Sequence, residues 1–353
     1  MAKQFDKNMI IPTKIEKQGI RFYSIDDEPF SIYGVWRDGD RYYRVPYDVA
    51  TNVSKVVTQK CMQTAGGRVR FKTNSPYVAI KVTLHNTEQI AMMTVVGTMG
   101  LDVYEGDVFL GSFRPPFHQG DGEFESLVEL GEARERELTI HFPLYAGICD
   151  FYVGIDENAT LSEGKPYGFD KPVVYYGSSI TNGGCCTRPG MTYEAQITRM
   201  LNVDHHNLGF GGSAKAELAI AEYVASLDML AFVYDYDYNA RDAEYLSETH
   251  ERMFKIVREK HPDLPIIIVS RPQYLNRNKR EERFEVIKRT YDNAVARGDK
   301  NVYLIPGWTF FDEIGNDYTV DDVHPTDLGF MYMARGIGKV LAEVLDIKQK
   351  SEV

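Results

Sequence analysis

The sequence lacks several features that would place it in a specialised class of protein. Among 353 residues there are four cysteines, too few to predict a disulfide framework in a chain of this size. No run of apolar residues is long enough to cross a bilayer. Basic residues are not in excess either, since the formal net charge is −11 and nucleic-acid recognition needs a basic surface. We therefore expect neither a membrane nor a nucleic acid among its partners.

Two further absences bear on location and cofactors. Residues 1–17 (MAKQFDKNMIIPTKIEK) contain no apolar core of the kind that a secretory signal needs, which predicts a cytoplasmic protein. The adjacent Cys185 and Cys186 are accompanied by no C-x-x-C spacing and no cluster of ligands. We expect them to be small buried thiols, with no metal bound.

What is present is ordinary globular composition, with 43% hydrophobic and 26% charged residues, in a chain long enough for two domains. Up to about Thr160, short β-type runs are separated by turn residues, and many alternate apolar with polar positions as half-buried strands do. These runs lie at 66–74, 77–85, 91–98, 107–113 and 136–145. They predict an all-β accessory domain, a sandwich of jelly-roll type, over residues 1–165.

A polar stretch at 156–172 (DENATLSEGKPYGFDKP) predicts a linker, and beyond it the pattern changes to strands alternating with helices. The strand candidates are 173–176, 205–208, 229–234, 265–270 and 302–305, and the helix candidates are 191–202, 213–226, 242–260, 281–297 and 327–346. This alternation favours a second, α/β domain over 166–353, with a parallel sheet covered on both faces. Ligands of such sheets bind at the carboxyl ends of the strands.

A serine follows the first of these strands, in the segment YYGSSITNGG (175–184). A turn from strand to helix at this point would raise the hydroxyl of Ser179 at the rim of the sheet. Serine is a weak nucleophile unless a base takes its proton. On its own, a serine in this position is more often a helix cap than a catalytic group, so the interpretation depends on where a base lies.

A suitable histidine follows the fifth strand, in the segment DDVHPTDLGF. His324 lies just before the last helix, and Asp321 can reach back to the imidazole and fix its tautomer. The segment also has a structural interpretation, a helix entry with Thr326 or Asp327 as N-cap, which is compatible with catalysis. We expect Ser179, His324 and Asp321 to act as nucleophile, general base and orienting carboxylate.

The other histidines in or beside predicted elements of this domain have structural interpretations. His205 and His206 begin a predicted strand, and His250 and His261 are expected on helix surfaces. Only His324 has a context that suggests catalysis.

An ester hydrolase also needs hydrogen-bond donors aimed at the developing oxyanion. The loop NLGFGGS (207–213) after the second strand offers glycine amides, and the loop DYDYNAR (235–241) after the third offers Asn239. Four strand ends thus supply a serine, a glycine turn, an asparagine and an Asp-x-x-His in that order. Such a coincidence is hard to obtain by chance.

One motif points elsewhere. Gly209, Gly211 and Ala214 match the dinucleotide fingerprint G-x-G-x-x-G/A after a strand and before a predicted helix. The match lies in the second βα unit rather than the first, and it lacks an acidic residue at the right distance. Nucleotide binding at 209–214 stays as a minor alternative.

The ordered loops resemble the four blocks of the SGNH/GDSL hydrolase superfamily. Gly177-Ser178-Ser179 corresponds to the G-D-S block, with Ser178 in place of the usual aspartate, and Asn207 to Gly212 corresponds to the glycine block. The resemblance implies a flavodoxin-like domain with a five-stranded parallel sheet, Ser179 as the nucleophile, and no cofactor. It also implies an oxyanion hole made by the amides of Ser179 and Gly212 and the side chain of Asn239.

The N-terminal half resembles one branch of this superfamily. Residues 100–104 (GLDVY) look like the GxDLY motif of a β-domain found ahead of a subset of these hydrolases, and residues 64–71, 143–145 and 183–190 also look like that group. Such two-domain proteins are similar to bacterial carbohydrate esterases that remove acetyl groups. The resemblance implies a serine esterase that acts on short-chain acyl esters, O-acetyl esters above all, of a saccharide.

Several points stay open at this level. A lipid, short-acyl or thioester substrate is an alternative within the superfamily, and a non-catalytic glycan-binding protein is an alternative outside it. Arg188 and Trp308 are candidates to contact an oligosaccharide or small-molecule ester, although a large aromatic such as Trp308 is more often simply packed. A homo-oligomer is compatible with the sequence.

Overall fold

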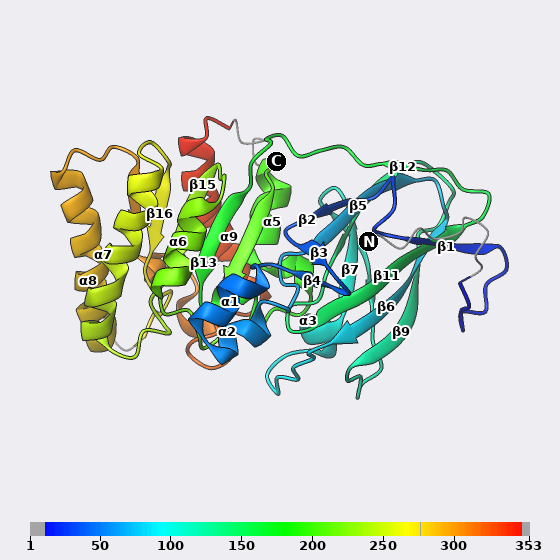
Figure 1. The fold of residues 1–353 in the computed structure, drawn as a ribbon, viewed down its shortest axis with the longest axis horizontal. Coiled ribbons are helices and arrows are strands. Elements are labelled where there is room, and N and C mark those ends of the chain that lie inside the picture. Colours follow the sequence, from blue (N-terminus) through cyan, green and yellow to red (C-terminus); the bar gives the residue numbers. More distant parts are fainter. Residues whose placement is uncertain (1–10, 276, 348–353) are drawn as a thin grey trace.

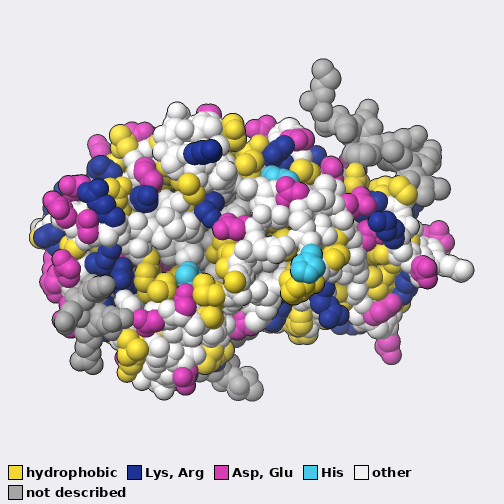
Figure 2. All heavy atoms as spheres, turned by 90° about the horizontal axis from the view of Figure 1, so that it is seen from below, with side chains coloured by type: hydrophobic (Ala, Val, Ile, Leu, Met, Phe, Trp, Pro, Cys, Tyr) yellow, Lys and Arg dark blue, Asp and Glu magenta, His cyan; other side chains and the backbone are white. Residues whose placement is uncertain are grey.

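The computed structural model describes residues 11–275 and 277–347, which form a β-rich unit and an α/β unit lying side by side (Figure 1). The N-terminal β-rich unit is on the right in this view, and the helices of the C-terminal unit are on the left. On the face drawn in Figure 2, acidic and basic side chains are interspersed. Within the described ranges, no helix combines the length and apolar character that a membrane span requires.

Two antiparallel sheets build the β-rich unit, with the strand orders β1-β11-β6-β9 and β12-β5-β10-β7-β8, and β2 pairs with β5. The first sheet contains β1 (Ile20–Ser24), β6 (Tyr77–His85), β9 (Gly122–Glu129) and β11 (Gly147–Asp156). The second contains β2 (Ser31–Tyr33), β5 (Arg68–Thr73), β7 (Leu101–Glu105), β8 (Val108–Phe113), β10 (Arg136–His141) and β12 (Leu161–Glu163). A separate ribbon pairs β3 (Trp36–Asp38) with β4 (Arg41–Tyr43).

Inward-facing side chains of both sheets share one core. Phe71 and Val103 from one sheet and Ile80 and Phe151 from the other belong to the same buried cluster. The alternation that suggested half-buried strands thus comes from two sheets that each turn one face inward. The prediction of a β-rich N-terminal domain is confirmed.

Two local predictions in this half were wrong. Residues 91–98 do not form a strand: they contain the start of α3 (Val95–Met99), because the hydroxyl of Thr94 caps the helix by accepting from the Gly97 amide. The polar stretch 156–172 is not wholly a linker. Its residues Leu161–Glu163 form β12, which pairs with β5 at the edge of the second sheet.

The α/β unit contains a parallel five-stranded sheet in the order β14-β13-β15-β16-β17. The strands are β13 (Val173–Gly177), β14 (His205–Gly209), β15 (Ala231–Asp235), β16 (Ile266–Val269) and β17 (Val302–Ile305). The helices are α4 (Ser179–Asn182), α5 (Tyr193–Leu201), α6 (Leu218–Ser226), α7 (Ala243–Lys260), α8 (Arg277–Ala296) and α9 (Asp327–Val344), with short 3-10 helices η1 (Pro189–Met191), η2 (Gly307–Phe311) and η3 (Gly315–Tyr318).

Both faces of this sheet are buried, which explains why its strands read as continuous apolar runs. Val174 and Tyr176 of β13 enter one core, whereas Val173 and Tyr175 enter another on the opposite face. The first strand lies between the second and third, which is the flavodoxin-like order. The predicted α/β fold with five parallel strands is therefore confirmed.

Helix α6 begins later than the sequence pattern predicts. The pattern predicts helix at 213–217, but Ala216 has a φ of 50°, which places it in the left-handed region. The turn is held from outside, because the Ala216 amide donates to the Tyr176 hydroxyl (2.8 Å). Regular helix starts only at Leu218.

The N-terminal half also contributes two helices that the sequence did not predict, α1 (Tyr47–Val53) and α2 (Lys55–Lys60). They pack against the α/β unit, as the blue helices in Figure 1 show, and α1 contacts α6. Ala50 and Val57 belong to the same buried cluster as Val174 and Ile220. The segment between β4 and β5 thus completes the core of the C-terminal unit.

His250 is buried rather than on a helix surface. Its ring stacks on Tyr234, with centroids 4.5 Å apart, and its Nδ1 is 2.8 Å from the hydroxyl of Thr290. Burial lowers the pKa of His250 to about 3. The imidazole is therefore neutral in the folded protein across the physiological range.

We expect this residue to weaken the fold in acid. The unfolded chain takes up a proton at His250 near its ordinary pKa of 6.5, whereas the folded chain does not, so stability falls as the pH drops below that value. The largest slope from one such group is about 1.4 kcal/mol per pH unit. In urea unfolding between pH 6 and pH 4.5, His250→Phe should show a shallower pH slope than wild type by about that amount. An unchanged slope would contradict this assignment.

Candidate active site

Ser179 is the first residue of α4, immediately beyond the carboxyl end of β13. The turn is tight, because a Cβ on Gly177 would lie 2.1 Å from the Thr181 hydroxyl oxygen. Ser178 is the N-cap, and its hydroxyl accepts from the Ile180 amide. Since Ser178 serves as the cap, the Ser179 side chain is free for another partner.

That partner is His324. The Oγ of Ser179 lies 2.8 Å from Nε2 of His324, and Nδ1 of the same ring lies 2.8 Å from Oδ2 of Asp321. Ser179, His324 and Asp321 therefore form one hydrogen-bonded series. The arrangement has the geometry of a nucleophile, a base and a carboxylate that fixes the tautomer of the base.

The loop that carries His324 is built around Asp321. The second carboxylate oxygen of Asp321 accepts from the amides of Val323 and His324, so one side chain shapes both the turn and the imidazole. Burial raises the pKa of Asp321, but hydrogen bonds from the His324 amide and ring outweigh it, and the net pKa lies below its ordinary value. Thr326 is the N-cap of α9, so helix capping and the candidate site coexist in this loop.

The loop after β16 joins this loop to the loop that carries Asn239, through a buried ion pair on one side and a hydrogen bond on the other. The guanidinium of Arg271 pairs with Asp237 at 3.0 Å, and Gln273 donates to the carboxylate of Asp322. Asp237 is 1% exposed, so the pair is held away from water. Loops after β15 and β17 are thereby fixed relative to each other.

Gly212 and Asn239 line the same pocket as Ser179 and His324. Gly212 has a φ of 69°, where a side chain would be strained although a Cβ would find open space. The side-chain oxygen of Asn239 accepts from the Ala214 amide (3.2 Å), which leaves its amino group as the donor. The Ser179 amide, in the first turn of a helix, has no intrahelical acceptor. The three residues whose donors the family resemblance implies for an oxyanion hole thus line one pocket.

A buried carboxyl contacts α4, the short helix that begins at Ser179. Asp235, at the end of β15, accepts from the hydroxyls of Thr181 (3.1 Å) and Tyr193 (3.4 Å). Burial raises its pKa to about 8, and those two hydrogen bonds only partly offset the effect.

Among the described residues, no group of three or more His, Cys, Asp or Glu side chains is placed to hold a metal ion.

The pocket has a volume of about 380 Å³ and draws its walls from both units. Six residues of its lining come from the N-terminal half: Lys60, Glu88, Ile90, Met92, Met93 and Tyr145. Their sequence context does not mark them as site residues, although Tyr145 falls in a segment that resembles the family. No periodicity marks Lys60 or Glu88, because only the docking of the two units brings them beside Ser179.

Arg188 and Trp308 lie outside this pocket. Arg188 lies where the two units meet, with its guanidinium over the ring of Phe109 and 3.2 Å from the hydroxyl of Tyr104. Trp308 packs edge-on against Phe284 and beneath Arg280. Both side chains are occupied by packing, so the structure does not place them where a ligand of Ser179 would bind.

Cys185 and Cys186 are both buried, and neither forms a disulfide. Cys185 also lines the pocket.

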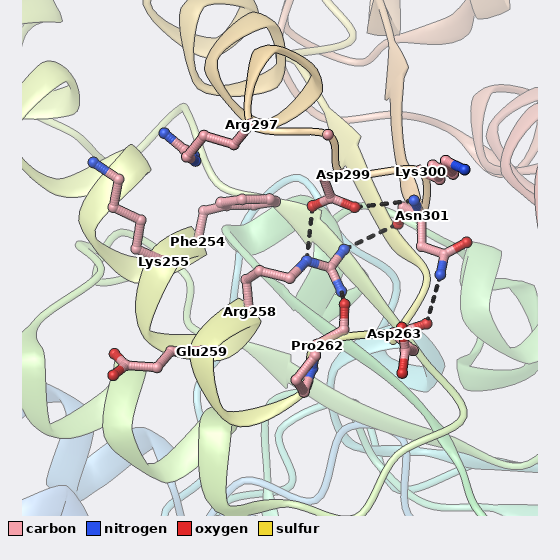
Figure 3. Close-up of a pocket in the computed structure, with 11 residues that line it drawn as sticks. Phe254, Lys255, Arg258, Glu259, Pro262, Asp263, Arg297, Asp299, Lys300 and Asn301 are labelled. Atoms are coloured by element: carbon pink, nitrogen blue, oxygen red, sulfur yellow. Dashed lines mark hydrogen bonds and ion pairs between the residues drawn. The ribbon is translucent and has the colours of Figure 1, made fainter.

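A larger cavity, of about 710 Å³, lies at the other edge of the sheet (Figure 3). Its residues 262–263 and 299–301 precede β16 and β17, so it opens at the amino ends of the strands. Arg258 points into a ring of acceptors there and pairs with Asp299 at 2.8 Å. The lining contains no histidine, serine or cysteine, so the chemistry belongs to the smaller pocket.

The first glycine of the dinucleotide-like motif has a packing role. A Cβ on Gly209 would lie 2.2 Å from the Asn182 amide nitrogen, so this glycine lets α4 approach β14. Helix α6 does not begin directly after the motif but at Leu218. A pyrophosphate would therefore find no helix N-terminus at the position that the fingerprint requires.

Family models identify both units. Residues 170–342 match the model of the GDSL-like lipase/acylhydrolase family. Residues 20–161 match the GxDLY model, which describes the N-terminus of SGNH-hydrolase-type esterases. The chain belongs to the GDSL/SGNH hydrolases. It is therefore an esterase or acylhydrolase with the two-domain organisation that the sequence predicted.

Several solved structures share the architecture of this SGNH hydrolase over nearly its whole length. A GDSL-like lipase from Bacteroides ovatus is 28% identical, with a TM-score of 0.83, and the match covers 94% of this chain and 100% of that one. A salicylyl-acyltransferase from a tetracycline biosynthetic pathway is 18% identical (TM-score 0.75; 94% and 100% covered). An acetyl xylan esterase from Butyrivibrio proteoclasticus is 12% identical (TM-score 0.61; 93% and 99% covered). The last two show likeness of fold, and no curated protein sequence matches the chain.

We predict that Asp321→Asn lowers kcat for p-nitrophenyl acetate at least tenfold while KM stays within about twofold. The amide keeps the size of the side chain but can no longer hold the imidazole through a charge-assisted bond. Asp327→Asn, at the start of α9, is the matched control, because its carboxylate accepts from Thr187 instead. Equal kcat values for Asp321→Asn and wild type would show that the carboxylate does not assist the histidine.

Proposed function

We propose that this SGNH hydrolase is a serine esterase that removes acetyl or other short acyl groups from the hydroxyls of a saccharide. The observation that carries the proposal is the series Ser179–His324–Asp321, with two distances of 2.8 Å, in a pocket that Gly212 and Asn239 also line. A serine next to a base next to a carboxylate is the arrangement that activates a hydroxyl for acyl transfer.

The reaction follows from the positions of these atoms. Nε2 of His324 takes the proton of Ser179 as Oγ bonds to the ester carbonyl carbon, and the carbonyl π electrons move to the oxygen. The amides of Ser179 and Gly212 and the amino group of Asn239 donate to that oxyanion. When the intermediate collapses, the bond to the sugar oxygen breaks and His324 returns the proton to it. Water then attacks the acyl-enzyme by the same steps, releasing the acid and restoring the Ser179 hydroxyl.

The substrate class is supported by the pocket and by a relative. The lining mixes apolar residues such as Ile90 and Met93 with the polar Lys60, Glu88 and Asn239, which suits a compact, hydroxylated ester. The acetyl xylan esterase that shares the fold acts on an acetylated saccharide by its description. Both observations favour a short acyl group on a sugar over a long-chain lipid.

Removing the Asn239 donor should slow chemistry rather than weaken binding. Loss of one oxyanion-hole donor costs about 2.7–4 kcal/mol, or roughly 10²–10³ in kcat. Asn239→Asp keeps an oxygen that accepts from the Ala214 amide but replaces the amino donor with a charged acceptor oxygen, so its effect should be at least this large. Steady-state kinetics should show this fall in kcat with a much smaller rise in KM. Full activity in Asn239→Asp would remove the residue from the oxyanion hole.

A panel of esters tests the substrate class. Wild type should release acetate from at least one acetylated oligosaccharide, and should prefer acetyl over butyryl and octanoyl p-nitrophenyl esters. Ser179→Ala should abolish all of these activities, which excludes a contaminating esterase. A preference for octanoyl esters would favour a lipase, and transfer of the acyl group to an added alcohol without acetate release would indicate an acyltransferase.

A further inference from the structure

One wall of the pocket comes from the N-terminal half of the chain. Lys60, the last residue of α2, has a side chain that is only 13% exposed, and Glu88 lies beside it in the loop after β6. Both line the pocket that contains Ser179. Neither residue belongs to the Ser–His–Asp series or to the candidate oxyanion donors.

The Lys60 side chain ends close to the candidate nucleophile. Its Nζ and the Cβ of Ser179 lie 3.8 and 3.5 Å from a single point, the place that a Cβ would occupy on Gly211. Because Gly211 has no side chain, that space is open between them. A group attached to the reacting ester can therefore reach both Ser179 and Lys60.

The polar atoms at this wall offer both kinds of hydrogen bond. Nζ of Lys60 lies 3.1 Å from Oε2 of Glu88, and the amide nitrogen of Gln63 lies 3.1 Å from the same oxygen. An ammonium group has three donors and a carboxylate has acceptor positions on both oxygens. After their mutual contact, Lys60 can still donate and Oε1 of Glu88 can still accept. Neighbouring sugar hydroxyls, which donate and accept in turn, match that combination.

The backbone that carries each of the two side chains is fixed by hydrogen bonds. The carbonyl of Lys60 accepts from the buried guanidinium of Arg44 (3.0 Å), which also donates to the Gly209 carbonyl (2.6 Å). The Glu88 amide donates to the Tyr145 carbonyl (2.9 Å). Fixed donors and acceptors lose less entropy when a ligand binds.

We propose that Lys60 and Glu88 bind the hydroxyl groups of the sugar whose ester is cleaved, and so select saccharide esters over simple aryl or alkyl esters. This inference rests on the proposed esterase function of the same pocket. It assigns the N-terminal half a direct part in substrate choice. The two opposite charges neutralise each other, so the pair favours a neutral hydroxylated ligand over an anionic one.

The test compares two substrates in four proteins. Lys60→Met and Glu88→Gln remove the charge at similar size, and Lys55→Met, an exposed lysine at the start of the same helix, is the matched control. The substrates are p-nitrophenyl acetate and the acetylated oligosaccharide that wild type cleaves fastest. Thermal unfolding of each variant confirms that the fold is retained.

We expect kcat/KM for the oligosaccharide to fall at least tenfold in both variants, mainly through KM, while p-nitrophenyl acetate hydrolysis stays within about twofold and Lys55→Met matches wild type. Equal losses on both substrates would show that the pair maintains the site rather than reading the sugar, and unchanged kinetics on both would show that it does neither. If wild type cleaves p-nitrophenyl acetate but no acetylated saccharide, the proposed substrate class fails, and this inference fails with it. Loss of p-nitrophenyl acetate hydrolysis in Ser179→Ala tests the esterase mechanism separately.

Discussion

One buried guanidinium joins the two halves of the protein at the pocket. Arg44 is fully buried and has carbonyl acceptors on both sides, from Lys60 in its own half and from Gly209 in the other. Burial lowers its pKa to about 10, so it remains charged at neutral pH. A buried charge is tolerated only when its donors are satisfied. The charge therefore makes the docking of α2 onto β14 a condition of the folded state. That docking positions both the loop 207–213 and the wall of the pocket that Lys60 forms.

The sequence motifs of the N-terminal half gain a physical explanation from the same contact. Asp102 of the GxDLY-like segment is buried, and its carboxylate accepts from the Gly190 amide (2.8 Å) and contacts the His141 ring (2.8 Å). Gly66 approaches Asn207 so closely that a Cβ would lie 2.6 Å from the Asn207 Cβ. These residues serve the junction between the units. The β-rich unit is thus part of the enzyme's architecture rather than a module attached to it.

The order of strands and loops was accessible from the sequence because it is local. Each strand of the parallel sheet is a continuous apolar run, and the groups that follow β13, β14, β15 and β17 meet at one edge by topology alone, so Ser179 and His324 could be paired across the chain. The sequence does not reveal which residues are buried by elements that are distant along the chain. The helical pattern around His250 does not reveal that Tyr234 and Thr290 enclose it, and nothing in residues 45–61 indicates that they complete a distant core. Lys60 and Glu88 were missed for the same reason.

The helices α1 and α2 also have a consequence for how the chain is made. Ala50 and Val57 are synthesised long before their packing partners Val174 and Ile220. Until the ribosome has released β13 and α6, the apolar face of α1 and α2 has no core to enter. The strands of the β-rich unit, which end at Glu163, are all synthesised before then. The N-terminal half must therefore wait for the second half to complete its fold, and a stalled or truncated chain would present that face to chaperones and proteases.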